Sequence, residues 1–355
     1  MTVSGDFLQR PILNGRANVP VGMAPMVGLS HVALRTVVRS YLPANARTIW
    51  PTEMLSSWRL PKERLGATAE TLRNPDETEL VPQILGNEEE PIKESVRRLK
   101  EWGAEGIDIN MGCPVQKALK HNYGVALMGD AGYAAEVVRM TVRNSQGLPV
   151  SVKLRAGLQN DLDYLLKFVQ GLEGAGADWI TLHPRLGAMK RRGSADWAQI
   201  RHVRERTGLA VIGNGDVQCA DDVFHLNEIS GCDSIMVGRA LAARPWMLWQ
   251  VGERLGFKSP PGKENRRAPT TPHEEGREFG AATHAFIDAL ERHFTFEQAS
   301  RRFKFHLRMT AGWLEFGHHL FARTSAARDF QDLRARVDEF FAVGQKMVAR
   351  TALRE

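Results

Sequence analysis

The amino-acid sequence predicts an α/β protein, namely a (β/α)8 TIM barrel followed by a small all-α C-terminal domain. Eight short apolar segments rich in Val and Ile recur along the chain, and stretches with helical spacing separate them. Parallel strands need such crossover connections, and eight units over about 240 residues fit a closed barrel better than an open doubly wound sheet. After the eighth unit only helical spacing continues.

Each predicted strand is a nearly continuous apolar run, as expected for a parallel sheet that is covered on both faces. The spacing also predicts crossover helices. Residues 91–101 place Ile92, Val96 and Leu99 on one face. Residues 161–170 begin with the acidic side chains that favour a helix N-terminus. The predicted strands are residues 19–24, 48–53, 80–85, 106–110, 150–155, 179–183, 210–214 and 234–238.

The chain is predicted to divide into two domains joined by a linker. Residues 1–257 form the barrel, and the polar, Pro-rich and basic segment at 258–272 has the composition of a linker. Residues 273–355 show helical spacing without strand signals, which indicates an all-α domain of three or four helices.

The composition is that of a globular protein in a reducing compartment. No apolar run approaches the roughly 20 residues needed to span a bilayer, and the N-terminus lacks the pattern of a secretory signal. The three cysteines match neither a metal knuckle nor a redox pair. These features predict a cytoplasmic protein with no metal site. The net charge of +6 is compatible with a polyanionic partner.

The residues after the last two predicted strands indicate a phosphate site. Ligands of TIM barrels bind at the C-terminal ends of the strands, and phosphate usually binds after strands seven and eight. Gly213, Gly215 and Gly238 stand there, and glycine lets backbone amides approach a phosphate closely. Arg239 adds a bidentate cation. Each turn alone is also explained as a tight βα turn, but together they favour a nucleotide-like cofactor with one phosphate.

Two further strand ends carry polar side chains. Lys153 ends the fifth strand inside the barrel mouth, where a lysine needs an anionic partner or a shifted pKa. It is interpreted as a cofactor contact, and the alternative is an ion pair with Asp108. His183 ends the sixth strand beside the phosphate loops, which favours a cofactor contact over a structural histidine. A metal role is not expected, because no second histidine stands at ligand spacing.

Cys113 differs from the other two cysteines in its surroundings. Cys219 and Cys232 lie in or beside the helix expected after the seventh strand and are interpreted as small buried side chains. Cys113 follows the fourth strand, between Gly112 and Pro114, and starts a polar, basic loop. A thiol there would face the barrel mouth. Because a free thiol is mostly protonated at neutral pH, it can donate a proton.

These motifs resemble those of the tRNA-dihydrouridine synthase family. The specific signal is the segment Asn110-Met111-Gly112-Cys113-Pro114 with Lys117, followed by Gly124-Val125-Ala126-Leu127-Met128. The other strand-end residues fall in the family's order at similar spacing. The resemblance covers residues 19–246 and, more loosely, the helical tail. The chain departs from the family pattern at Leu186, where members usually have Thr, so substrate choice stays open.

The resemblance implies an enzyme that holds FMN, takes electrons from NADPH and reduces the 5,6 double bond of uridines in tRNA. Cys113 would be the general acid that protonates carbon 5 of a uridine extracted from its stack. Asn110 would position the uracil or the flavin ring, and Lys117 and Arg185 match further family positions. The cofactor would be held by Ala24, Pro25, Met26, Gln83, Lys153, His183, Asn214, Gly215, Asp216, Gly238 and Arg239.

Two basic segments are candidates for RNA contacts. Lys190, Arg191 and Arg192 form a triplet that either binds RNA phosphate or is a solvated loop. In the helical tail, aromatic residues interleave with basic ones, which suits a surface that follows a nucleic-acid backbone. The alternative is an amphipathic helix with a cationic outer face, and both can hold together. The basic residues of the tail segment are Arg301, Arg302, Lys304 and Arg308.

Three other functions remain open at this level. Another FMN barrel that acts on a small molecule, such as a dihydroorotate or enoate oxidoreductase, would have no use for a basic helical tail. An RNA-binding protein that keeps the barrel as a scaffold is the non-enzymatic alternative, because fold alone does not imply function. A dihydrouridine synthase acting on an RNA other than tRNA would share every motif above.

Overall fold

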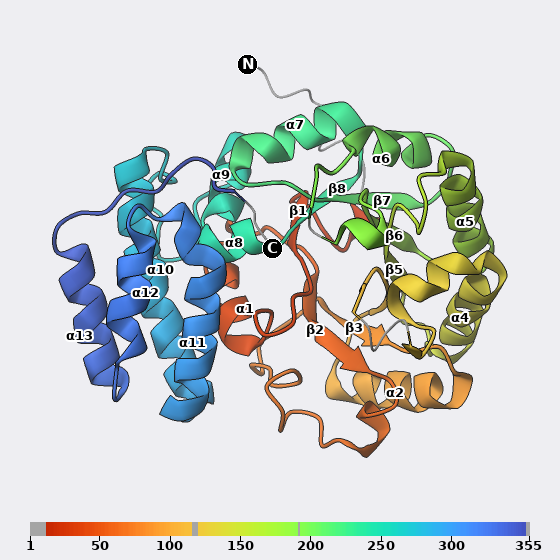
Figure 1. Ribbon diagram of the computed structural model, residues 1–355, viewed down its shortest axis with the longest axis horizontal. Helices are drawn as coiled ribbons and strands as arrows, with labels where there is room; N and C mark the ends of the chain where they lie inside the picture. Colours follow the sequence, from red (N-terminus) through yellow and green to blue (C-terminus); the bar gives the residue numbers. More distant parts are fainter. Residues whose placement is uncertain (1–11, 116–119, 191, 353–355) are drawn as a thin grey trace.

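The computed structural model describes residues 12–115, 120–190 and 192–352. In this part of the chain, eight parallel strands form one curled sheet with helices on its outside (Figure 1). The predicted (β/α)8 barrel is therefore confirmed. The strands are β1 (Val21–Met23), β2 (Trp50–Ser56), β3 (Leu80–Leu85), β4 (Ile107–Met111), β5 (Val150–Arg155), β6 (Trp179–His183), β7 (Ala210–Asn214) and β8 (Ser234–Val237).

The strand order shows how the sheet curls round. It runs β1-β8-β7-β6-β5-β4-β3-β2, so the first strand pairs with the last, with Val21 opposite Ile235. All the paired strands are parallel, so their C-terminal ends meet at one rim, called the barrel mouth below. The strands are buried almost throughout, which explains their continuous apolar sequences.

The crossover helices pack apolar stripes onto the sheet. In α2, the side chains of Ile92, Val96 and Leu99 are fully buried, as predicted. The N-cap residue Asp161 starts α5 by accepting a hydrogen bond from the backbone amide of Tyr164. The helices around the barrel are α1 (Val32–Arg39), α2 (Glu89–Trp102), α4 (Ala131–Asn144), α5 (Leu162–Gly174), α6 (Trp197–Arg204), α7 (Ala220–Ser230), α8 (Arg239–Ala243) and α9 (Met247–Arg254).

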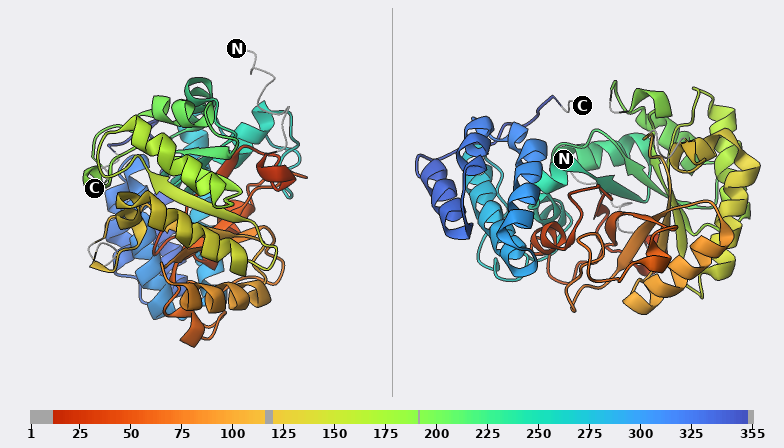
Figure 2. Two further views of the ribbon diagram at one scale, coloured as in Figure 1. Left: turned by 90° about the vertical axis from the view of Figure 1, so that its right-hand side faces the viewer. Right: turned by 60° about the horizontal axis from the view of Figure 1, so that its bottom comes forward.

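Four α-helices follow the barrel within the described residues and pack together beside α1 (Figure 2). They are called the helical region below, and within the described chain none is long and apolar enough to cross a membrane. Their bounds are α10 (Pro272–His293), α11 (Phe296–Thr310), α12 (Gly317–Ser325) and α13 (Phe330–Phe341). Short 3-10 turns are η2 (Leu13–Gly15), η3 (Leu60–Lys62), η4 (Gly124–Gly129), η5 (Gly187–Met189) and η6 (Ala311–Trp313).

Buried polar contacts fix the helical region to the barrel. The Tyr41 hydroxyl, just after α1, donates to Glu278 on α10 at 2.8 Å. Within the segment predicted as a linker, Lys263 and Arg266 both pair with the same Glu278, at 3.0 and 2.6 Å. The segment therefore packs against α10. Its last residue in the prediction, Pro272, is the first residue of α10.

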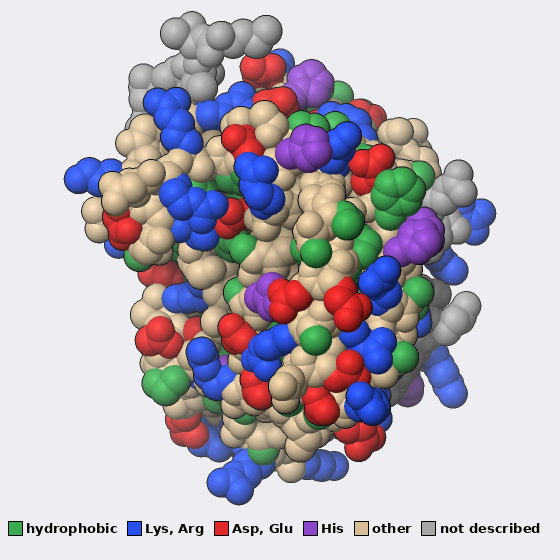
Figure 3. Space-filling view, turned by 90° about the vertical axis from the view of Figure 1, so that its left-hand side faces the viewer, with side chains coloured by type: hydrophobic (Ala, Val, Ile, Leu, Met, Phe, Trp, Pro, Cys, Tyr) green, Lys and Arg blue, Asp and Glu red, His purple; other side chains and the backbone are tan. Residues whose placement is uncertain are grey.

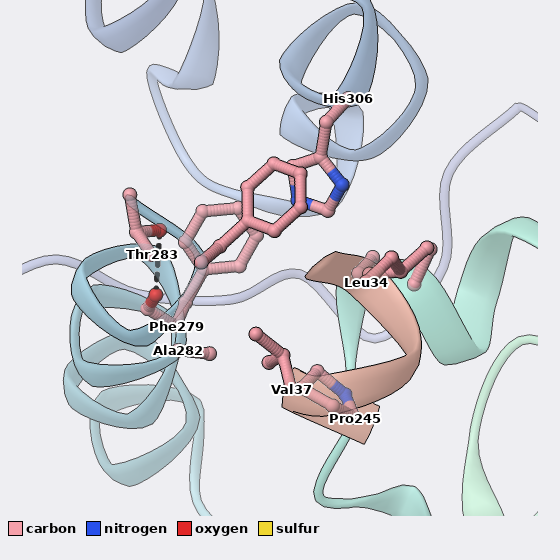
Figure 4. A pocket seen from close by; sticks show the side chains of 10 residues that line it. Leu34, Val37, Pro245, Phe279, Ala282, Thr283 and His306 are labelled. Carbon is pink, nitrogen blue, oxygen red and sulfur yellow. Dashed lines mark hydrogen bonds between the residues drawn. The ribbon is translucent and has the colours of Figure 1, made fainter. Parts of the chain in front are cut away.

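A small cavity of about 10 Å³ lies where α1, α10 and α11 meet (Figure 4). It holds at most one water molecule, and it lies outside the barrel mouth. His306 lines this cavity, with its ring 4.4 Å from the ring of Phe286. His31 belongs to the same cluster, with its ring 6.0 Å from that of Phe286, and both its ring nitrogens are buried without a hydrogen bond.

We predict that this cluster makes stability sensitive to acid. Burial lowers the pKa of His306 to about 3 and lowers that of His31 well below its ordinary value. Below about pH 6.5 the unfolded chain binds protons at these histidines and the folded chain does not, so stability falls with pH by up to ~1.4 kcal/mol per unit for each. Thermal unfolding between pH 7 and pH 5 measures this. His306→Leu should flatten the dependence, whereas His318→Leu, at an exposed ring on α12, should not.

Candidate active site

The barrel mouth brings together side chains from the ends of several strands. The described residues predicted for the site lie on or directly after their strands, where parallel strands deliver their C-terminal ends to one rim. Lys117 and Arg191 lie outside the described residues. The predicted positions around the rim are Ala24, Pro25, Met26, Gln83, Asn110, Cys113, Lys153, His183, Arg185, Asn214, Gly215, Asp216, Gly238 and Arg239.

A chain of side-chain hydrogen bonds connects β3, β4 and β5 beneath the mouth. Gln83 donates from Nε2 to Asp108 Oδ2 at 2.6 Å, and Ser151 donates from Oγ to Asp108 Oδ1 at 2.7 Å. Asn110 donates from Nδ2 to Gln83 Oε1 at 2.7 Å. The Asn110 Oδ1 atom accepts from the backbone amide of Cys113 at 2.9 Å. Gln83 and Asn110, predicted to touch cofactor or substrate, thus also support the Cys113 backbone.

Lys153 lies on β5 opposite Asn110 of β4, and Cys113 comes three residues after Asn110. Burial and the neighbouring Arg155 lower the pKa of Lys153 to about 8, while Asp108 and Cys113 act to raise it. The alternative ion pair with Asp108 is not formed within 4.0 Å in the described structure, where the two carboxylate oxygens accept from Gln83 and Ser151. The ammonium group is therefore available to an anionic or electron-accepting ligand in the mouth.

His183, Arg185 and Asp216 form a clamp between the loops after β6 and β7. Arg185 is buried and contacts Asp216 Oδ1 at 2.5 Å and His183 Nε2 at 3.0 Å. Asp216 Oδ2 accepts from the backbone amide of Ala195 at 2.7 Å. Arg185 was predicted to contact RNA and Asp216 to contact the cofactor. In the structure these two side chains form an ion pair with each other. Neither position is free to bind a ligand with these atoms unless the clamp opens.

The clamp also fixes the protonation state of His183. Burial, Lys153, Arg155 and Arg185 lower the pKa of His183 well below its ordinary value, so the ring is neutral at pH 7. Since a guanidinium can only donate, Nε2 accepts from Arg185 and the proton lies on Nδ1. His183 therefore presents an N–H donor, which suits a phosphate or carbonyl oxygen.

The glycine-rich loops lie beside this clamp. Gly215 has φ of +118°, and a Cβ there would lie 2.8 Å from Ala195 Cβ and 3.0 Å from His183 Cδ2, so the loops after β6 and β7 approach each other closely. Gly213 has a different reason to be glycine. A Cβ there would lie 2.7 Å from Leu226 of α7, so packing against the outer helices explains it.

The loop after β1 completes the rim. A Cβ at Gly238 would lie 3.5 Å from Met26 Sδ and 3.8 Å from Ala24 Cβ, which brings the ends of β1 and β8 together. Asn214 donates from Nδ2 to the Met236 carbonyl oxygen at 2.7 Å and so holds β7 to β8. Arg239 is the first residue of α8, directly after this contact. The phosphate position predicted from the sequence therefore lies where contacts join the ends of β1, β7 and β8.

Helix α11 runs along one side of the mouth. A Cβ at Gly28, in the loop after β1, would lie 2.8 Å from the Phe305 ring, so the helix and loop are in contact. Arg302 stacks 4.2 Å over Phe294, and its pKa is lowered by burial while Glu53 and Glu70 act to raise it. Arg302 thus faces the barrel. Arg301 and Arg308 are exposed, and Lys304 is half-buried.

Sequence reasoning missed Glu53 as a site candidate. It lies in the middle of β2, is almost fully buried, and its side chain accepts from the backbone amide of Gly28 at 2.7 Å. Burial raises the pKa of Glu53 to about 7. The usable signal was its position at the end of a predicted strand, which is where barrel enzymes place functional side chains. Within the described residues, no cluster of His, Cys, Asp and Glu could hold a metal ion.

A parallel eight-stranded barrel whose mouth combines a lysine, a neutral histidine, glycine-rich loops and a thiol is the architecture of a flavin-dependent TIM-barrel oxidoreductase. Comparison with known families identifies which one. Residues 22–326 match the model of the family described as dihydrouridine synthase. The chain belongs to the dihydrouridine synthase family.

Individual relatives agree with this assignment. A probable tRNA-dihydrouridine synthase of Rhodobacter capsulatus is 32% identical over 266 residues, which is 74% of this chain and 77% of that protein. One of Mycobacterium tuberculosis is 30% identical over 71% of this chain and 65% of that protein. Among solved structures, the old yellow enzyme TcOYE with pHBA has a TM-score of 0.50 at 7% identity, covering 74% and 96% of the two chains. That likeness shows the barrel fold alone.

Proposed function

We propose that this protein is a cytoplasmic tRNA-dihydrouridine synthase that uses FMN and NADPH to reduce the 5,6 double bond of uridines, with Cys113 as general acid. The observation that carries the proposal is the position of Cys113. Cys113 follows β4 at the mouth, and Asn110 accepts from its backbone amide at 2.9 Å. Lys153 lies on the neighbouring strand β5, opposite Asn110. The family match and the names of the relatives supply the substrate class.

The mouth fits a flavin mononucleotide. Lys153 has no anionic partner within 4.0 Å among the described residues, and His183 offers an Nδ1–H donor. The loops at Gly215 and Gly238 expose backbone beside these groups. FMN, when bound, supplies the hydride for the reduction. The residues proposed to hold it are Ala24, Pro25, Met26, Gln83, Lys153, His183, Asn214, Gly215, Asp216, Gly238 and Arg239.

A side chain of the protein supplies the proton that the reduction requires. Reduction adds a hydride to carbon 6 of the uracil and a proton to carbon 5. We assign that proton to the Cys113 thiol, and the thiolate left behind recovers a proton from solvent. The neighbouring Lys153 ammonium stabilises the thiolate while it exists. Asn110 would contact the uracil or the flavin ring, since its Nδ2 lies at the mouth and has a second proton to donate.

For tRNA we propose the edge of α11 that borders the mouth. Phe305 and Arg302 on this helix face the loops after β1 and β2, and the adjacent basic residues point to solvent. The side of the helical region turned away from the barrel has Lys and Arg mixed with Asp and Glu (Figure 3), for example in the pair between Arg334 and Asp288. A polyanion is favoured at the first surface and not at the second.

The basic loop after β6 would contact the RNA from the opposite side. Lys190 and Arg192 are exposed there, and Arg185 fixes the loop through the carbonyl oxygens of Arg192 and Gly193, both at 3.2 Å from its Nε. Lys117 and Arg191, which lie outside the described residues, would be further RNA contacts, as their positions in the sequence predict. Arg185 would act on RNA through this loop.

The function is tested by assaying dihydrouridine in tRNA. Deletion of the gene should remove dihydrouridine from specific tRNA positions, and the wild-type gene should restore it. The purified protein with FMN and NADPH should form dihydrouridine in an unmodified tRNA transcript. If the protein reduces a small enone instead and leaves tRNA and other RNA unchanged, the proposal is wrong. If dihydrouridine forms only in an RNA other than tRNA, the proposed substrate is wrong but the proposed reaction is right.

We predict a salt-dependent loss of tRNA binding when the exposed edge of α11 is neutralised. The variant Arg301→Ala/Lys304→Ala/Arg308→Ala should lower affinity and reduce the slope of log K against log salt by about 2 to 3, since each lost phosphate contact removes nearly one released counterion. Filter binding at several salt concentrations measures it. The matched control, Arg97→Ala/Arg139→Ala/Arg143→Ala on outer helices α2 and α4, should leave the slope unchanged.

A further inference from the structure

Asp108 is a buried carboxylate at the barrel mouth with no part in the chemistry proposed above. It lies on β4 and is almost fully buried. A buried charge is costly unless it is hydrogen-bonded, and both oxygens are, by Gln83 Nε2 at 2.6 Å and Ser151 Oγ at 2.7 Å. A carboxylate at such a buried position is expected to have a structural or functional role, and its hydrogen-bond partners indicate which one.

The carboxylate sets the direction of a relay of amides. Because it can only accept, Gln83 must turn Nε2 toward it, which leaves Gln83 Oε1 to accept from Asn110 Nδ2 at 2.7 Å. Asn110 must then turn Oδ1 toward the backbone amides of Gly112 and Cys113, at 3.1 and 2.9 Å. In the reverse orientation the Asn110 NH2 group would face two N–H donors.

The same two residues are held from two other directions. The Gly112 carbonyl oxygen accepts from Arg155 Nε at 2.9 Å, and the Cys113 carbonyl oxygen accepts from the Val125 amide at 3.1 Å. All four backbone polar groups of Gly112 and Cys113 are therefore bonded. Only the two amides depend on the relay, since Arg155 and Val125 act from other parts of the chain.

We propose that Asp108 is a positioning residue for the Cys113 thiol, acting through Gln83 and Asn110. The inference rests on the proposed function, because it takes Cys113 as the proton donor. The thiol must lie within hydrogen-bond reach of carbon 5 of the base, and the relay fixes the backbone from which it projects. Asp108 touches neither substrate nor thiol.

The relay is tested by two substitutions at Asp108. Asp108→Leu is similar in size and removes the acceptor, so Gln83 is free to reorient. Dihydrouridine formation in single turnover should then fall by about 10²-fold, the cost of a misplaced reacting group. Asp108→Asn retains an acceptor for Gln83 and a donor for Ser151 Oγ, so it should stay within about threefold of wild type. Equal losses in the two variants, or no loss in Asp108→Leu, would overturn the proposal.

A double-mutant cycle with Cys113→Ala separates positioning from a general structural role. If Asp108 acts through the thiol, Asp108→Leu should add less than about threefold to the loss already caused by Cys113→Ala. Additive losses would show that Asp108 acts elsewhere and would refute the inference. Normal product formation by Cys113→Ala alone would instead refute the acid role in the proposed function, so the two failures are distinguishable.

A readout without turnover completes the test. Alkylation of Cys113 by iodoacetamide, followed by peptide mass spectrometry, should become several-fold faster in Asp108→Leu, while Cys219 at the outer helix α7 serves as the internal control. An unchanged rate of Cys113 alkylation contradicts the proposal.

If Asp108→Leu does not fold, the double variant Asp108→Asn/Ser151→Ala replaces it. In that double variant the amide introduced at position 108 loses its second partner and can rotate, so product formation should fall about tenfold, although each single variant stays near wild type.

Discussion

Cys113→Ala is expected to abolish most dihydrouridine formation while leaving flavin binding and NADPH oxidation intact. General acid catalysis contributes about 10²–10⁴-fold. The other two cysteines, Cys219 and Cys232, flank helix α7. The substitution removes one sulfur and leaves the backbone bonds of residue 113 in place, because Asn110 and Val125 bind its amide and carbonyl groups. Single-turnover product formation, measured beside NADPH oxidation, separates the proton-transfer step from cofactor reduction.

Cys219→Ala is the matched control. Cys219 is half-buried as the N-cap residue of α7, is not among the proposed site residues, and should tolerate alanine without loss of product. Comparable losses in the two variants would indicate a general effect of thiol removal. Normal product formation by Cys113→Ala would mean that solvent or another group supplies the proton, and the general-acid assignment would be wrong.

The strands of the barrel followed closely from the sequence, and the differences have backbone causes. The third, fifth, sixth and seventh strands have the predicted bounds. The second extends to Ser56 because the register with β3 shifts between Pro51 and Met54 and pairing then continues. The predicted strand, 48–53, ends inside this irregular stretch, and the pairing of residues 54–56 with β3 beyond it has no separate signal in the sequence. The short α8 directly after β8 also went unpredicted, because helical spacing does not separate five residues from α9.

The candidate site was predictable as a set of positions but not as a set of partners. Parallel strands deliver their ends to one rim whatever the loops do, so Cys113, Lys153 and His183 could be grouped from sequence alone. That Arg185 binds Asp216 depends on the loop containing Asp216, which has φ of +59°. Such a left-handed residue in a loop after a strand is set by tertiary contacts and leaves no periodic signal. Glu53 was missed for the related reason that its hydrogen bond with the Gly28 amide depends on the path of the loop after β1.

Glu77→Ala should be the most destabilising single substitution among those considered, at a cost of about 3–5 kcal/mol. Arg35 on α1 and Glu77 are fully buried and joined by two bonds, Nε to Oε1 at 2.7 Å and Nη2 to Oε2 at 2.9 Å. Removing the carboxylate leaves a guanidinium in the core without a counter-ion. The thermal midpoint at pH 7 should fall by roughly 4–7 °C, measured by circular dichroism.

The double variant Arg35→Met/Glu77→Leu tells whether the cost comes from the orphaned charge. Replacing a buried ion pair by apolar side chains of similar size is often nearly neutral, so it should be more stable than Glu77→Ala although it removes more polar contacts. Recovery should be incomplete, because Arg35 also donates to the carbonyl oxygens of Ser30 and Leu72, at 2.9 Å each. These two bonds tie the loops after β1 and β2 to α1, and the first of those loops supplies the Gly28 amide that Glu53 accepts from. If the double variant is less stable than Glu77→Ala, the hydrogen bonds of the Arg35 guanidinium to these loops contribute more to stability than the cost of its unpaired charge.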